Sequence, residues 1–116
     1  MRVLDGEKTL IRIFLGDSDK WHHVPLDRAL LERLRREGFA GATVIRGVAG
    51  FGAASVIHTA HVLDLSSDLP VVIEVVDDAE HVDKLLPVLD EMLSGSALVT
   101  IEKVRVLRYG PAKASK

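Results

Sequence analysis

The glycines of Gly50-Phe51-Gly52 are the first residues in this 116-residue chain that suggest chemistry. Glycine can adopt a positive φ, which lets neighbouring backbone N–H groups face an anion at close range. No lysine follows, since Ala53-Ala54-Ser55 stand there, and the segment does not join a strand to a helix as P-loops and dinucleotide-binding turns do. The segment therefore predicts either an anion-binding loop or a simple turn.

Histidines form the second set of candidates. His58 and His61 are three residues apart and would share one face of a helix, and His22, His23 and His81 are the others. A tetrahedral zinc site needs three or four convergent ligands, and the chain has no cysteine and no carboxylate spaced to complete such a set. We expect solvent-facing or hydrogen-bonded histidines, with a metal site at His58 and His61 as the alternative.

Catalytic groups are hard to assemble from this sequence. Asp77-Asp78 could act in acid–base chemistry or hold magnesium, but the pair stands where a helix is expected to begin, and capping that helix is an adequate structural role. Ser94, Ser96 and Thr100 lie near no histidine that could activate them as nucleophiles. We therefore expect a protein that is not an enzyme.

The overall charge argues against several partners. With 15 basic and 17 acidic residues and only 4% aromatic residues, the chain has neither the positive field nor the stacking groups that nucleic-acid binding requires. The same balance favours neither an anionic membrane surface nor membrane insertion. Charges at Asp5, Glu7 and Lys8 interrupt any apolar secretory signal, so a cytoplasmic location is the default expectation.

The elements that would position these residues can be predicted from apolar spacing. Runs of β-branched and aromatic residues predict strands at 9–16, 42–48, 70–76 and 98–109. Apolar residues at helical spacing predict one helix at 26–37, stopped by Gly38, and a second that Asp77 or Asp78 caps and Pro87 kinks. Its apolar stripe is expected to comprise Val82, Leu85, Leu86, Leu89 and Leu93.

This order of elements predicts an α+β ferredoxin-like βαββαβ fold, an antiparallel sheet with two helices on one face. We expect a single domain over 1–116, with its core at about 9–110 and a frayed tail at 111–116. The 70–76 strand presents valines on both faces, so the uncovered sheet face is expected to bury against another subunit. The alternative is a monomer with a few exposed valines.

The connection between the second and third predicted strands, 49–69, is far longer than a hairpin loop, and such loops are usually functional. Its inner part, 56–63, is apolar enough to form a short helix or hairpin. Arg46 and Arg105 are further candidates, as strand cations able to pair with phosphate. Their alternative role is pairing with nearby carboxylates such as Glu102.

Several segments together resemble a widespread uncharacterised prokaryotic family of PII-like proteins, over about 10–109. These segments are Pro25-Leu26, Gly41-Ala42-Thr43-Val44-Ile45-Arg46-Gly47, Gly50-Phe51-Gly52, Ile57-His58, Asp68-Leu69-Pro70-Val71-Val72 and Val76-Asp77. The chain is also similar, more remotely, to the PII nitrogen-signalling proteins, in Gly41-x-Thr43-Val44, in Gly50-Phe51-Gly52 and in the basic strand that ends Arg108-Tyr109-Gly110.

The resemblance implies a homotrimer of ferredoxin-like subunits with small-molecule clefts between neighbours and a signalling loop at 49–69. By position, Gly50, Gly52 and Arg108 match PII binding elements, with Phe51 between the glycines. The implied ligand is a small anion, with an adenine nucleotide as the example from PII. Ala53-Ala54 replace the Gln and Lys of PII, and the phosphate turn is shortened to Ser94-Gly95-Ser96.

The resemblance also implies a regulated partner, either a membrane transporter or an enzyme. A rival implication comes from the CutA family, whose trimeric ferredoxin-like members are associated with divalent cations.

Overall fold

The computed structural model describes residues 3–52, 58–59, 69–93 and 97–111. Its elements in chain order are β1 (Leu4–Gly16), β2 (Lys20–Trp21), β3 (Val24–Pro25), α1 (Leu26–Arg36), β4 (Thr43–Arg46), β5 (Ala49–Gly50), β6 (His58–Thr59), β7 (Pro70–Asp77), α2 (Ala79–Met92) and β8 (Leu98–Tyr109). All four predicted strands and both predicted helices are present.

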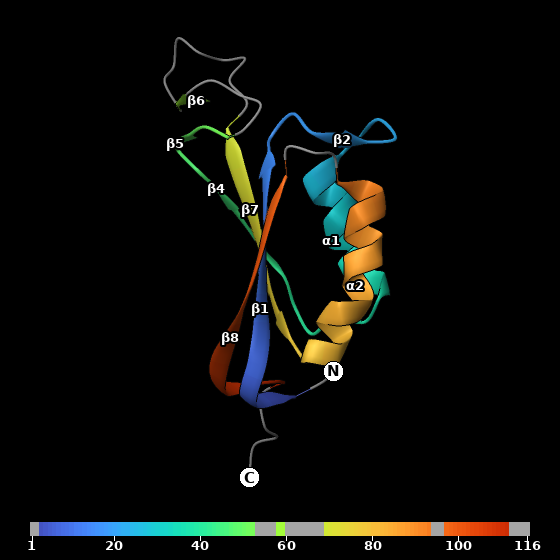
Figure 1. Ribbon diagram of the computed structural model, residues 1–116, viewed down its shortest axis with the longest axis vertical. Coiled ribbons are helices and arrows are strands. Elements are labelled where there is room, and N and C mark those ends of the chain that lie inside the picture. Colours follow the sequence, from blue (N-terminus) through green and yellow to red (C-terminus); the bar gives the residue numbers. More distant parts are fainter. Residues whose placement is uncertain (1–2, 53–57, 60–68, 94–96, 112–116) are drawn as a thin grey trace.

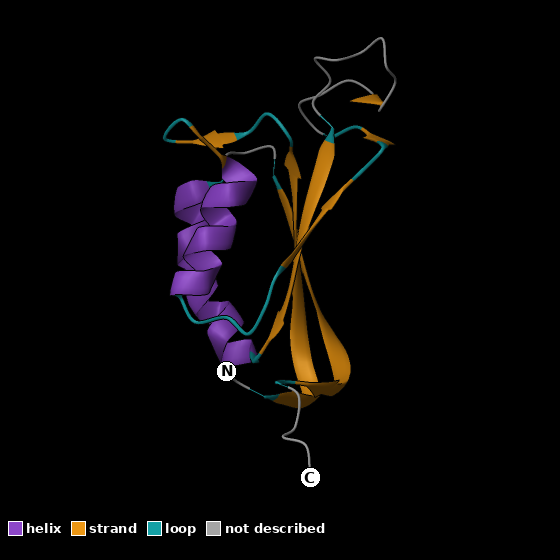
Figure 2. Cartoon of the chain, turned by 180° about the vertical axis from the view of Figure 1, so that it is seen from behind, coloured by secondary structure: helices purple, strands orange, loops and turns teal. Residues whose placement is uncertain are grey.

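The main sheet has the strand order β4-β7-β1-β8, and each neighbouring pair is antiparallel. Both helices lie on one face of this sheet, as Figures 1 and 2 show. The predicted α+β ferredoxin-like fold is therefore confirmed. Neither α1 nor α2, the two helices of the described residues, lies on the opposite sheet face, called the open face below (Figure 2).

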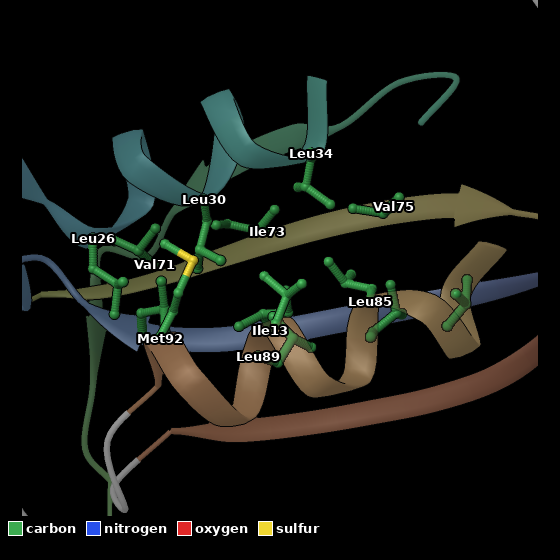
Figure 3. Close-up of a cluster of buried hydrophobic side chains, with 14 residues drawn as sticks. Ile13, Leu26, Leu30, Leu34, Val71, Ile73, Val75, Leu85, Leu89 and Met92 are labelled. Atoms are coloured by element: carbon green, nitrogen blue, oxygen red, sulfur yellow. The ribbon is translucent and has the colours of Figure 1, made fainter. Parts of the chain in front are cut away.

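The core lies between the helices and the sheet. Strand alternation buries Val71, Ile73 and Val75 of β7, and α1 buries Leu26, Leu30 and Leu34 against them (Figure 3). Removing each such side chain from water contributes roughly 1.5–3 kcal/mol.

The stripe of α2 differs in part from the prediction. Its buried residues are Val82, Leu85, Val88, Leu89 and Met92, while Leu86 is exposed and Leu93 is the residue that follows the helix. Leu86 is turned away from the core because it follows Leu85 directly, about 100° further around the helix.

The end of α1 confirms the predicted role of Gly38. Gly38 has a φ of +83°, and its N–H bonds to the carbonyl of Arg35, while the N–H of Phe39 bonds to the carbonyl of Leu34. These two bonds define a Schellman motif, which satisfies carbonyls left open at a helix end. Phe39 packs beside the core, so the chain leaves α1 in a fixed direction.

Two strand boundaries were predicted wrongly. β1 begins at Leu4 rather than at residue 9, because its first residues pair with the end of β8 and carry no local apolar signal. Gly6, with a φ of +80°, lies at the irregular point in that pairing. The 42–48 strand is shorter, since only Thr43–Arg46 pair with β7.

A small hairpin, β2–β3, was not predicted. Trp21 pairs with Val24, so His22 and His23 form a two-residue turn, and both have positive φ, 47° and 70°. Such a turn favours glycine or asparagine, which explains why the His-His sequence gave no turn signal. The ring of His22 stacks on Trp21 with centroids 4.1 Å apart.

Replacing His23 with glycine is expected to stabilise the protein by about 1 kcal/mol, because glycine removes the steric cost of the left-handed conformation. The measurement is chemical denaturation. His22→Gly should gain less, since it also loses the stacking contact with Trp21. A loss of stability in His23→Gly would show that the turn carries no such strain.

Candidate functional site

Arg46, at the end of β4, makes two ion pairs. Its guanidinium pairs with the carboxylate of Asp17 and, through Nη2, with Oδ2 of Asp27 at 3.2 Å. Asp27 lies in the first turn of α1, so Arg46 connects the sheet edge to this helix. Its charge is balanced by two carboxylates, and its proposed action on an anion stays a prediction.

Two glycines after β4, Gly47 and Gly50, lie close to Pro70. A Cβ on Gly47 would lie 2.6 Å from Cγ of Pro70, and a Cβ on Gly50 would lie 3.0 Å from the same atom. Neither glycine has a positive φ. Gly50 does not use the positive φ that glycine permits, and its backbone passes close to Pro70. Phe51, the next residue, is 74% exposed.

The predicted ligand residues lie at two ends of the sheet. Arg46 pairs with Val71 of β7, and Val71 pairs in turn with Leu15 of β1. Arg105 of β8 pairs with Glu7, near the other end of β1. The stretch of β1 from Glu7 to Leu15 spans about 26 Å at roughly 3.3 Å per residue. One chain therefore does not bring Arg46 and the Gly50-Phe51-Gly52 segment together with Arg105 and Arg108.

Arg108 lines a pocket of about 410 Å³, called the Arg108 pocket below. Its walls are Leu4, Ala40, Gly41, Ala42, Thr43, Glu74, Val76, Val106, Arg108 and Tyr109. Apolar side chains and a few polar groups in a cavity of this size suit a small molecule. Sequence reasoning missed Thr43, Glu74 and Tyr109 as pocket residues, because only the strand register brings them together.

Two carboxylates near this pocket, those of Glu74 and Glu102, are already paired with Arg12. Arg12 donates from Nε to Glu74 at 2.8 Å and from Nη1 to Glu102 at 2.6 Å. The hydrogen bond to Glu74 is the main cause that raises the pKa of Arg12 above its usual value. Glu102, named as an example of a carboxylate partner for the candidate arginines, thus pairs with Arg12, and among those candidates it is Arg46 that has carboxylate partners within the described residues. In the described part of the chain, Arg108 forms no ion pair.

Asp77 and Tyr109 fix the wall of the Arg108 pocket. The carboxylate of Asp77 is fully buried and accepts hydrogen bonds from the N–H of Ala40 at 2.9 Å and of Asp78 at 2.7 Å. The hydroxyl of Tyr109 donates to the carbonyl of Ala40 at 2.7 Å. Both polar groups of Ala40 are therefore held, which positions the 40–42 segment.

The predicted capping role of Asp77-Asp78 needs correction. Asp78 is the N-cap residue of α2, yet its side chain makes no capping bond to the helix. It pairs with Nζ of Lys8 at 2.8 Å instead, and this hydrogen bond raises the pKa of Lys8. Asp77 faces the helices because the alternation of β7 extends to it.

Nothing in the described residues favours a metal site. They contain no group of three or more metal-ligating side chains placed to share an ion. His58 lies in the short strand β6, which pairs with β5, so of the short helix and the hairpin expected for 56–63 the hairpin fits this residue. His61 lies outside the described residues, as do Ala53-Ala54 and Ser94-Gly95-Ser96. His81 donates from Nε2 to the carbonyl of Glu37 at 2.7 Å.

Among the described helices, none is long and apolar enough to cross a membrane.

Comparison with solved structures defines the class of fold. A putative PII-like signaling protein from Thermus thermophilus superposes with a TM-score of 0.64 at 18% identity, covering 92% of this chain and 94% of the other. CPII, a nitrogen regulatory PII-like protein from Thiomonas intermedia K12 whose structure was solved with ADP, AMP and bicarbonate, gives 0.63 at 14% identity, with coverage of 91% and 99%. The fold is that of the PII-like proteins.

Sequence comparison gives the family. The profile of DUF190, described as an uncharacterized ACR, matches residues 8–106, and the chain belongs to this family. A UPF0166 protein of Aquifex aeolicus (strain VF5) is 36% identical over 107 residues, which are 92% of this chain and 98% of the relative. A UPF0166 protein of Methanocaldococcus jannaschii is 33% identical over 99 residues, or 85% and 91%. The family predicted from sequence motifs is thus confirmed.

Proposed function

We propose that this protein is a PII-like regulatory protein, not an enzyme, that binds a small anionic ligand, with an adenine nucleotide as the first candidate. The observation that carries this proposal is the Arg108 pocket, where a guanidinium without an ion pair in the described chain borders a cavity of about 410 Å³. A cation in a partly apolar cavity is suited to a ligand with a phosphate and a flat apolar base. The solved structure of CPII with ADP and AMP supports the choice of nucleotide.

The binding site is proposed to lie between two chains. Within one chain, Arg105 lies about 26 Å along β1 from the level of Arg46, and Arg108 lies further still, so one small ligand cannot reach both ends. The Gly50-Phe51-Gly52 segment lies at the Arg46 end, beyond β4. Its contribution to the Arg108 pocket therefore has to come from a neighbouring chain.

The open face supplies a surface for that neighbour, in the proposed homotrimer. Ile45, Phe14, Val72 and Leu98 lie side by side across all four strands of this face. The outer two are well exposed, Ile45 at 46% and Leu98 at 55%. An apolar row that crosses a whole sheet is typical of a surface that another subunit covers.

The signal is proposed to leave through the 49–69 connection, toward a transporter or an enzyme as the regulated partner in the cytoplasm. Val48, directly before this connection, and Phe51, near its start, are 75% and 74% exposed. Large exposed apolar side chains beside a binding site suit contact with a second protein.

Replacing Arg108 with alanine is expected to weaken nucleotide binding about tenfold, because a charge-assisted hydrogen bond to phosphate contributes roughly 1.5 kcal/mol or more. The measurement is calorimetric titration with ATP, ADP and AMP. Arg28→Ala, an exposed arginine of α1 that does not line the pocket, is the matched control. Binding of none of these nucleotides to the unaltered protein would refute the nucleotide assignment.

Mixed chains test whether two subunits form the site. Arg108→Ala chains and Phe51→Ala chains are unfolded, mixed in equal amounts and refolded. Each cleft then takes its Arg108 side from one chain and its Phe51 side from another, so about a quarter of the clefts should have both residues intact and bind with full affinity. Neither variant alone should show these strong sites. A mixture that behaves as the simple average of the two variants would place the whole site within one chain.

A further inference from the structure

A second and larger groove lies beside the Arg108 pocket. It has a volume of about 820 Å³ and is called the α1 groove below. Its walls are Leu31, Leu34 and Arg35 of α1 and the segment Gly38, Phe39, Ala40, Gly41 and Ala42. The groove shares Ala40, Gly41 and Ala42 with the Arg108 pocket, but its other residues are different.

Within the part of the chain that the structure describes, no side chain fills this groove. Leu31 and Arg35 are four residues apart, so they share a face of α1 next to the buried stripe. Across from them, Ala40, Gly41 and Ala42 are too small to reach the helix. The one large side chain of that segment, Phe39, packs against His81 of α2, with ring centroids 4.3 Å apart.

The segment that forms the far wall is held in place at several points. The Schellman motif fixes Gly38 and Phe39, and His81 binds the carbonyl of Glu37. Asp77 and Tyr109 hold the N–H and the carbonyl of Ala40. The groove is therefore formed before any ligand arrives, which lowers the entropy cost of binding.

The charge of the groove selects the kind of ligand. Arg35 is exposed, and in the described part of the chain it forms no ion pair. The carboxylate of Glu37, close by in sequence, is occupied by Nε of Arg33 at 2.7 Å. Arg33 is paired with Glu37, so the charges left in the last turn of α1 to outweigh its partial negative end are those of Arg35 and Arg36.

We propose that the α1 groove is a binding site for a small organic anion with an apolar body, separate from the nucleotide site. The apolar body lies along Leu31 and the Phe39–Ala42 segment, and the anionic group pairs with the guanidinium of Arg35. The proposal does not depend on nucleotide binding, because Arg108 is no part of this groove.

The test uses the fluorescent probe 8-anilinonaphthalene-1-sulfonate, an apolar anion, and N-phenyl-1-naphthylamine, its uncharged counterpart. Arg35→Ala should weaken sulfonate-probe binding about tenfold, the loss of one charge-assisted contact, and leave binding of the uncharged probe unchanged. Arg36→Ala, which removes the same charge from a neighbouring position outside the groove, should bind both probes normally. Leu31→Glu places a carboxylate in the groove and should weaken binding of the sulfonate probe more than any other variant.

Two results would overturn the proposal. One is an unchanged affinity for the sulfonate probe in Arg35→Ala, and the other is an equal loss in Arg36→Ala, which would indicate a general charge effect. Circular dichroism of each variant confirms that the fold is intact. Titrations with ATP and ADP on the same variants test the nucleotide site separately. Because Arg35→Ala retains Arg108, its nucleotide binding should be unchanged whichever result the probes give.

Discussion

Replacing Asp77 with asparagine is expected to lower the free energy of unfolding by about 2–3 kcal/mol, although the two side chains have nearly the same volume. Each carboxylate oxygen of Asp77 accepts one backbone N–H bond, from Ala40 and from Asp78. An amide has only one acceptor oxygen, so its NH₂ group must face one of these N–H donors. The side chain is fully buried, and water cannot replace the lost bond. Chemical denaturation measures the change.

Asp78→Asn is the matched control, one residue further along the chain. The side chain of Asp78 is 47% exposed and pairs with Lys8 at the surface, so its loss should cost less than about 1 kcal/mol. Hydrogen exchange gives a second readout, because the Ala40 amide should exchange faster in Asp77→Asn than in Asp78→Asn. Equal stability of the two variants would mean that Asp77 does not anchor the 40–42 wall.

The part of the fold that follows local rules could be predicted from the sequence. Alternation at Val71, Ile73 and Val75 gave the inward face of β7, and Leu26 with its four-residue repeats gave the buried face of α1. Gly38 marked the end of that helix correctly. These signals are local because burial on one face imposes a fixed period on the residues of a single element.

The missed features depend on contacts between segments far apart in the chain. The first residues of β1, with Asp5 and Glu7 exposed, become a strand only because β8 pairs with them. Local sequence predicts Asp77 as a helix cap, because its bond to Ala40 joins residues 37 positions apart and leaves no local signal. Strand pairing and buried hydrogen bonds of this kind leave no periodic pattern in the sequence.

In the candidate site, too, local signals could be read from the sequence and contacts between distant segments could not. Motif resemblance proposes Arg108 as a ligand residue, and Arg108 lines a pocket, whereas Thr43, Glu74 and Tyr109 join it there only through the register of the sheet. Arg46 was chosen for its charge alone, which could not reveal that Asp17 and Asp27 already pair with it. Charge can be read from one residue, but the partner that neutralises it cannot.

Replacing Gly47 with alanine is expected to cost about 2 kcal/mol, the effect of forcing a methyl group into a filled space. The new Cβ would lie 2.6 Å from Cγ of Pro70 and 3.3 Å from its carbonyl oxygen. The backbone cannot easily retreat, because the N–H of Gly47 is bonded to that carbonyl at 2.7 Å. The clash therefore lies between the end of β4 and the proposed signalling connection. Chemical denaturation of the variant measures the loss in free energy of unfolding.

A double-mutant cycle with Pro70→Ala isolates the cause, since that change removes Cγ and leaves the carbonyl in place. In the Pro70→Ala background, Gly47→Ala should cost less than about 1 kcal/mol, and the difference between the two costs is the energy of the contact. The same cost in both backgrounds would show that the ring of Pro70 does not require glycine at position 47. A reduced cost would mean that Gly47 is needed for packing against β7, so that ligand contact is not required to explain the glycine there.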